Sequence, residues 1–148
     1  MARYAIDEAL RTKVLSIDGV SDLIEGRLYA DDAAPQNPTF PYGVITLIGP
    51  ADRSRKLAGV NKDVSARYQL DFWGLVKAKV REVAELVAAR SADGGLDGLQ
   101  ETIGSGATAA YVQSCRIENV RHGSEPPQSA GEARVFNAGF DAVIVFNE

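Results

Sequence analysis

Two stretches of the chain space their apolar residues like amphipathic helices. In the first, apolar residues recur three and four positions apart and predict a helix over about residues 3–16; they are Ile6, Ala9, Leu10, Val14 and Ile17. In the second, the same spacing predicts a helix over residues 75–90, whose apolar face consists of Val76, Val80, Val83, Ala84 and Val87. A short helical turn is expected between them, at residues 21–26.

Four other stretches have the patterns of β-strands. The clearest is residues 64–73, where apolar and polar residues alternate, so that one face points inward and the other outward. Trp73 is the exception, because it falls on the polar face. Residues 43–48, 111–121 and 136–146 are the other three predicted strands.

The segments between these elements predict one extended connector and two long loops. Three prolines within residues 30–42 exclude a helix there and indicate an extended connector. Residues 51–63 are polar and carry more basic than acidic side chains, so we expect a long, locally basic loop. A second surface loop is expected over residues 122–132, which contain two consecutive prolines.

The order of elements is helix, strand, strand, helix, strand, strand. Because both strand pairs are sequential, antiparallel pairing is favoured. The predicted fold is therefore α+β: an antiparallel sheet of about four strands, with two main helices packed on one face and long surface loops. At 148 residues the chain has the length of a single domain, and we expect residues 1–148 to form one.

Composition and charge narrow the possible functions. The formal net charge is -4, which argues against a protein that coats DNA or RNA without sequence preference. A single Cys and a single His exclude a disulfide framework within the chain and a multi-histidine metal site. No apolar run approaches the length of a membrane span, and the acidic start does not match a signal peptide, so we expect no membrane association and an intracellular site of synthesis.

One glycine pattern matches a nucleotide-binding motif without its context. Gly104, Gly106 and Ala109 have the spacing of a dinucleotide-binding loop. That motif follows a strand and opens a helix, whereas here a β-like run follows and an Asp-Gly-rich stretch precedes. A loop is therefore the favoured interpretation, and no cofactor is predicted.

The remaining reactive groups also have simpler structural interpretations. His122 could act as a general base oriented by Glu118 or Glu125, but the sequence shows neither a nucleophile nor a pocket, so a solvated loop histidine is favoured. Cys115 lies on the apolar alternation of a predicted strand and is expected in the core. We predict no catalytic residue and no metal site, and therefore not an enzyme.

Interface candidates come from the loops and from one aromatic residue. The basic cluster of the expected 51–63 loop could contact DNA phosphates, remain solvated, or form a salt-bridging arm to another subunit; its residues are Arg53, Arg55, Lys56 and Lys62. Trp73 either lies at an interface or is covered by the second helix, and both remain open. Arg121 and His122, at the start of the second loop, complete the candidates.

Several segments, in order and spacing, resemble one protein family along nearly the whole chain. They are residues 26–29 (GRLY), 41–45 (PYGVI), 67–74 (RYQLDFWG), 117–121 (IENVR) and 125–127 (EPP). This set resembles the tail terminator family of long-tailed bacteriophages, also called tail completion or tail-to-head joining proteins. The 51–63 and 121–133 segments depart most from that pattern.

The resemblance implies a structural role in the virion. Such proteins form a ring, usually of six subunits, on the head-proximal end of the tail tube. The ring ends tube polymerisation and presents a docking surface to the head connector or stopper protein, while DNA passes through the open bore without sequence-specific binding. Members have neither cofactor nor catalytic residues. The expected location is the virion tail, reached from the host cytoplasm during assembly.

Two alternatives remain open. The first is a head-completion or stopper protein of the phage neck, which would bind the portal-side adaptor and not the tube protein. The second is a small α+β ligand-binding or enzymatic domain, which would require a polar pocket with perturbed groups. The ring number and the type of tail are not predicted.

Overall fold

The computed structural model describes residues 6–30, 34–48, 52–56, 59–127, 131 and 133–147, with side chains outside 52–56 and 59–63. The helices are α1 (Asp7–Ser16), α2 (Val20–Ile24) and α3 (Lys77–Ala88), with short 3-10 turns at Ser91–Asp93 and Gly106–Thr108. The strands are β1 (Leu28–Ala30), β2 (Tyr42–Leu47), β3 (Asp52–Lys56), β4 (Gly59–Gly74), β5 (Glu101–Ile103), β6 (Ala110–Glu125) and β7 (Val135–Asn147).

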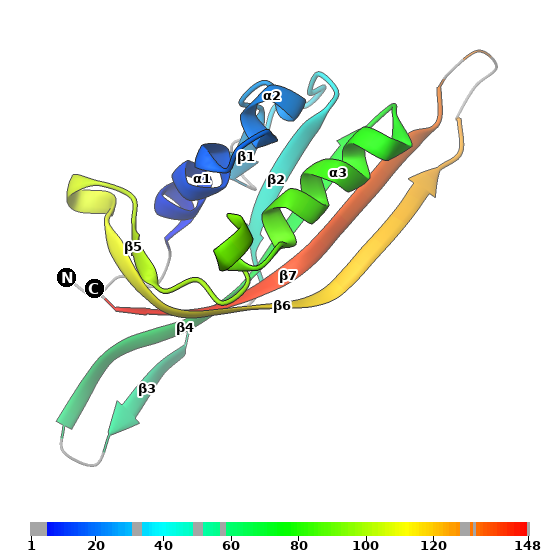
Figure 1. Cartoon of the computed structure of the whole chain (residues 1–148). Coiled ribbons are helices and arrows are strands. Elements are labelled where there is room, and N and C mark those ends of the chain that lie inside the picture. The colour runs from blue at the N-terminus through cyan, green and yellow to red at the C-terminus, as the bar shows by residue number, and fades with distance from the viewer. Residues whose placement is uncertain are drawn as a thin grey trace.

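All described strands belong to one curled sheet. Its order is β1-β2-β4-β7-β6-β5. β3 is outside this order and pairs with the first part of β4, from Gly59 to Ser65. Every pair is antiparallel except β1 with β2, which is parallel. The helices lie together on one side of the sheet, and the other side carries no described helix (Figure 1).

The core fills the space between the helices and the sheet. The alternation predicted for residues 64–73 is confirmed: every second β4 side chain is buried, from Val64 to Phe72. The apolar stripe of α3, which includes Val80 and Val87, is buried as well. The phenol oxygen of Tyr68 accepts a hydrogen bond from the Ile6 backbone N–H at 2.8 Å, which fixes the entry to α1 against the sheet.

The α+β class, the two main helices and the four predicted strands are confirmed, but the strand count is wrong. The sheet has seven strands among the described residues, not about four. β1 and β5 have three residues each, too few to show an alternation in the sequence. The expectation of a wholly antiparallel sheet is also wrong, because Leu28 to Ala30 run parallel to β2.

The first predicted long loop is mostly strand, and the second begins later than expected. Residues 51–63 were expected to be a loop, but β3 and the first part of β4 pair there as an antiparallel hairpin, here called the arm. The second loop is shorter than expected, because β6 continues to Glu125 and β7 begins at Val135. Polar residues pair well in a hairpin because the ladder is made by the backbone, so low hydrophobicity did not reveal these strands.

Candidate assembly interface

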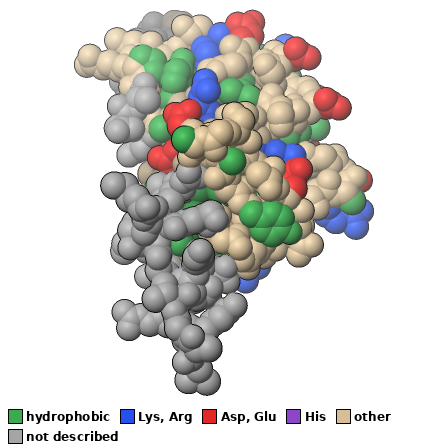
Figure 2. All heavy atoms as spheres, turned by 90° about the vertical axis from the view of Figure 1, so that its left-hand side faces the viewer, with side chains coloured by type: hydrophobic (Ala, Val, Ile, Leu, Met, Phe, Trp, Pro, Cys, Tyr) green, Lys and Arg blue, Asp and Glu red, His purple; other side chains and the backbone are tan. Residues whose placement is uncertain are grey.

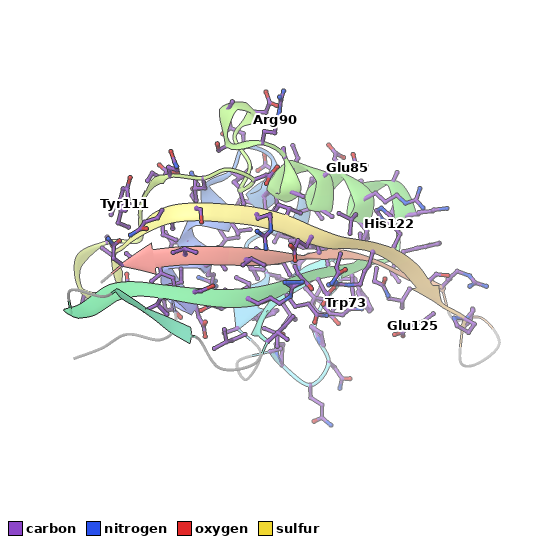
Figure 3. All side chains as sticks on the ribbon, turned by 90° about the horizontal axis from the view of Figure 1, so that it is seen from below. Trp73, Glu85, Arg90, Tyr111, His122 and Glu125 are labelled. Atoms are coloured by element: carbon purple, nitrogen blue, oxygen red, sulfur yellow. The ribbon has the colours of Figure 1, made fainter. Side chains whose placement is uncertain are left out.

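The side of the sheet away from the helices carries polar and charged side chains, and we call it the open face. The residues that alternate with the buried core positions of β4 point to it, as do their cross-strand partners on β2, β7 and β6. Figure 3 shows β4, β7 and β6 side by side, with Trp73 on β4, Glu85 on α3 and His122 on β6. The open face is thus formed by several strands and no described helix.

A network of ion pairs crosses the open face from β4 to β6. The Arg67 guanidinium donates to Glu118 at 2.8 Å and to Asp141 at 3.3 Å. The Arg121 guanidinium donates to Asp141 at 2.9 Å and to Asp71 at 3.1 Å. Each arginine therefore joins two carboxylates from different strands, and the network ties together three neighbouring strands.

Asp141 is the centre of this network. Its side chain is charged but buried, with 4% of the residue exposed, and no other charged residue of known burial in the described part of the chain is buried. Burial alone would raise the pKa of its carboxyl, but hydrogen bonds from Asn119 and Arg121 and the positive charges of Arg121 and Arg67 outweigh burial and hold the pKa below its usual range. Asp141 is therefore ionised in the folded protein and stabilises its arginine partners in place.

A bulge in β6 brings Asn119 and Arg121 to Asp141. The register between β6 and β7 shifts between Glu118 and Arg121, and Asn119 has a φ of 51°. Its side-chain amide donates to Asp141 at 3.0 Å. Asn tolerates the left-handed region better than most residues, so this position combines a backbone and a side-chain requirement. The extra residue re-aims Arg121 onto the open face.

An aromatic stack lies at one end of the open face. The rings of Tyr42 and Trp73 are 5.2 Å apart and nearly parallel, with an interplanar angle of 19°. Tyr42 is in register with Trp73 across the β2–β4 ladder. Arg27 donates to the backbone carbonyls of Pro41 at 2.9 Å and Phe40 at 3.2 Å, which anchors the end of the proline connector beside the stack. Trp73 lies on the face away from α3, so the second helix does not cover it. Its place in an interface stays a prediction.

The predicted basic residues lie on the arm, whose side chains are outside the described part of the structure. Arg53, Arg55 and Lys56 belong to β3, and Lys62 belongs to β4. β7 pairs with β4 only from Asp63 onward, so the arm projects beyond the rest of the sheet (Figure 1). At about 3.3 Å per residue, Lys62 and Trp73 are roughly 36 Å apart along β4. The structure therefore separates the basic cluster from the aromatic stack.

His122 and Arg121 are neighbours in the chain but face opposite sides of the sheet. His122 is exposed and lines a depression between β6 and α3 with Lys77 and Arg81. Arg121 is bound to Asp71 and Asp141, and these partners raise the pKa of its guanidinium although burial alone would lower it. Among the predicted candidates whose side chains the structure describes, Trp73 and Arg121 share a surface, the open face.

Sequence reasoning missed Asp71 and Asp141 of the network and the partner of the tryptophan. It considered Glu118 only as a partner of His122, whereas Glu118 binds Arg67 on the opposite side of the sheet. Asp141 is the single charged residue of β7, which is the one local signal for a charge that must be paired. Tyr42 gives no such signal, because it follows three prolines in a connector. The segments 67–74 and 117–121, which carried the family resemblance, supply most of the network.

Cys115, one of the reactive groups considered, lies in the core. Cys115 is buried as predicted, and burial, with the charge of Asp97, raises the pKa of its thiol to about 12.

In the described part of the chain, no group of three or more His, Cys, Asp or Glu is placed to hold a metal ion. No described helix is long and apolar enough to cross a membrane. On the side seen in Figure 2, acidic and basic side chains are interspersed among the coloured residues.

Comparison with known proteins finds a shared fold. A chain from the virion of a native gene transfer agent particle aligns over 97% of this chain and 99% of its own, with a TM-score of 0.54 and 16% sequence identity. A second solved chain aligns over 94% of this chain and 92% of its own at 15% identity, but its TM-score of 0.47 is too low to carry an argument. No protein-family model and no curated protein matches the sequence. At this identity the likeness establishes the fold.

Proposed function

We propose that this chain is a structural, non-enzymatic protein of a phage-like virion, and that it acts as a tail terminator. In this role it forms a ring at the head-proximal end of the tail tube, ends tube polymerisation and offers a surface to the head connector. The observation that carries the proposal is the fold shared, over nearly the full length of both chains, with a component of a gene transfer agent virion. The order of the segments that resemble tail terminators supports the finer role.

The arm supports assembly with other chains. A closed ring of identical subunits needs two different, complementary surfaces on each subunit. A two-stranded hairpin that projects from the core is marginally stable in water on its own, so a neighbouring chain is a physically reasonable support for it. The arm would supply one of the two surfaces, and the compact body would supply the other.

Imaging with a mass measurement tests the proposal. Negative-stain images of the purified protein, alone and with its cognate tail tubes, should show rings or a cap at one tube end. Light scattering should give roughly 95 kDa for a ring of six subunits of 15.8 kDa. A protein that ignores tubes and binds the portal-side adaptor would instead be a stopper of the neck.

Shortening the arm tests which part of the chain assembles. Residues 54–61 would be replaced by a short turn, which leaves the pairing of Asp52 with Ser65 and of Arg53 with Val64 in place. We expect a folded subunit, which keeps its helical circular dichroism signal and unfolds cooperatively, but which no longer forms rings or caps. A matched control keeps the hairpin but changes Arg53, Arg55 and Lys56 to Ser, which separates the arm's backbone from its charge. Normal capping by the shortened protein would exclude the arm as the contact.

A further inference from the structure

The outer edge of β6 is open over most of its length. β5 pairs with β6 only from Ala110 to Val112, and the Gly98 N–H donates to the Cys115 carbonyl at 2.8 Å. No described strand pairs with the outer edge of β6 over residues 116–125 (Figure 1). The bulge at Asn119 interrupts this edge, so its regular part runs from Arg121 to Glu125. At about 3.3 Å per residue this is roughly 17 Å, enough to template a short further strand.

Basic side chains gather beside this edge. Lys77 and Arg81 lie one turn apart on α3, and with His122 they line a depression of about 180 Å³. None of the three forms an ion pair or side-chain hydrogen bond with another described residue. Lys77 is the first residue of α3, whose first turn contains no acidic residue, so this cation sits at the end of the helix where positive charge is least favourable. Helix stability therefore does not explain Lys77.

The depression continues along α3 into an apolar one. The second hollow, of about 140 Å³, shares His122 and is lined also by Ala84, Ala88, Glu85 and Val120. Val120 is a β-branched residue of β6 that is 63% exposed. We call the two hollows together the α3–β6 groove. It is basic near Lys77 and apolar near Val120, and it runs beside the open edge.

We propose that the α3–β6 groove binds an extended acidic segment of a partner protein. The segment would add a strand to β6 through backbone hydrogen bonds and place a carboxylate among Lys77, Arg81 and His122. An open strand edge beside a helix is the arrangement by which proteins recognise extended peptides: the ladder supplies affinity and the hollows supply specificity. The inference goes beyond the terminator role, because it assigns a surface and a partner chemistry that a ring does not require.

A protein partner fits the groove better than a nucleic acid. Glu85 and the exposed Val120 line the same groove as the cations. A surface that follows a phosphate backbone relies on continuous positive charge, which a carboxylate in its path would weaken. An acidic and partly apolar peptide meets both ends of the groove.

Defined peptides test the proposal directly. The probe is a fluorescein-labelled decapeptide of alternating threonine and valine with two aspartates near one end, and binding is followed by fluorescence anisotropy. We expect it to bind at least tenfold more tightly than the same peptide with two lysines. A version with alternate backbone amides methylated should also bind at least tenfold more weakly, because it cannot form the ladder. Absence of binding by the acidic peptide up to millimolar protein, or equal binding of all three peptides, would overturn the proposal.

Matched variants place the peptide in the groove. Lys77→Glu should weaken binding about tenfold or more, whereas Lys79→Glu should not, because Lys79 lines a separate depression with Phe40 and Pro41. Val120→Lys should block the edge, whereas Tyr111→Lys, where β5 already covers the strand, should not.

A short DNA duplex at the same salt concentration serves as the competing probe. Tighter binding of the duplex, lost in Lys77→Glu, would replace the peptide by a nucleic acid. Each variant is also imaged with tail tubes, so a failure of the terminator role is recorded separately from a failure of peptide binding.

Discussion

Gly139 allows the ion-pair network to cross β7, and replacing it tests that geometry. Gly139 is in register with Asp71 on one side and with Arg121 on the other. A Cβ at this position would collide with Asp71 Oδ1 and lie 2.6 Å from the backbone oxygen of Leu70. The Leu70 carbonyl is part of the β4 ladder and cannot rotate away as a side chain does. Gly139→Ala should therefore displace β4 from β7 locally and push Asp71 away from Arg121.

The size of the effect follows from these contacts. Inserting a methyl group where the neighbouring backbone cannot move freely costs about 1–3 kcal/mol. Loss of the contact between Asp71 and Arg121 adds at most about 1 kcal/mol, because the Arg121 side chain is 37% exposed and water screens the pair. We expect a loss of about 2–3 kcal/mol in the free energy of unfolding. For a chain of this length, that lowers the Tm by roughly 5–10 °C.

Thermal and urea denaturation followed by circular dichroism measure this loss. Gly123→Ala is the matched control, since its Cβ would lie 2.9 Å from Asn137 Oδ1, the end of a side chain that can turn aside. We expect the control to change the Tm by less than half as much. If Gly139→Ala melts within a degree of the wild type, the close approach of β4 and β7 at this position is wrong.

Three further outcomes follow from the same structure. Asp141→Asn should cost about 1–3 kcal/mol at neutral pH, because its arginine partners lose a charged acceptor but stay partly exposed to water. Because the folded-state pKa of Asp141 is lowered, this difference from the wild type should be full above the unfolded pKa of about 3.9 and shrink as the pH falls below it. Denaturation at several pH values measures it. Tyr42→Ala should shift the fluorescence of Trp73, the single tryptophan, to longer wavelength and lower stability by about 1 kcal/mol. Cys115 should react with a thiol reagent at pH 8 only after the protein is unfolded in denaturant.

Long, strongly patterned elements could be predicted from the sequence, and short or polar ones could not. The alternation of residues 64–73 and the stripe of residues 75–90 each repeat several times, so burial on one face leaves a readable signal. The arm leaves no such signal, because β3 is held to β4 by backbone hydrogen bonds. These bonds form whichever polar side chains the two strands carry. β1 is parallel to its neighbour and three residues long, so only the tertiary structure defines it.

Two members of the candidate interface, Trp73 and Arg121, could be predicted from the sequence, but the arrangement could not. Trp73 was identified because it broke an alternation, and the structure places it on the open face. Its stacking on Tyr42 depends on the register between β2 and β4, which the connector sets and no local pattern encodes. Similarly, the contrast between Arg121 and His122 depends on how β6 alternates after the bulge at Asn119.

The internal charge balance of the open face bears on how copies of the chain would meet. Arg67 and Arg121 are each satisfied by carboxylates of the same chain, so they offer a partner little uncompensated charge. Among the described residues, the arm and the edge of β6 are two surfaces that present backbone to a partner. Contacts through strand edges place few demands on side-chain identity, so a chain that assembles in this way can keep its fold while its sequence diverges. Such contacts also resist salt, whereas assembly through the arginines and lysines of the arm would weaken as ionic strength rises. Ring formation measured across a salt series would therefore separate contacts made by backbone from contacts made by the charges of the arm.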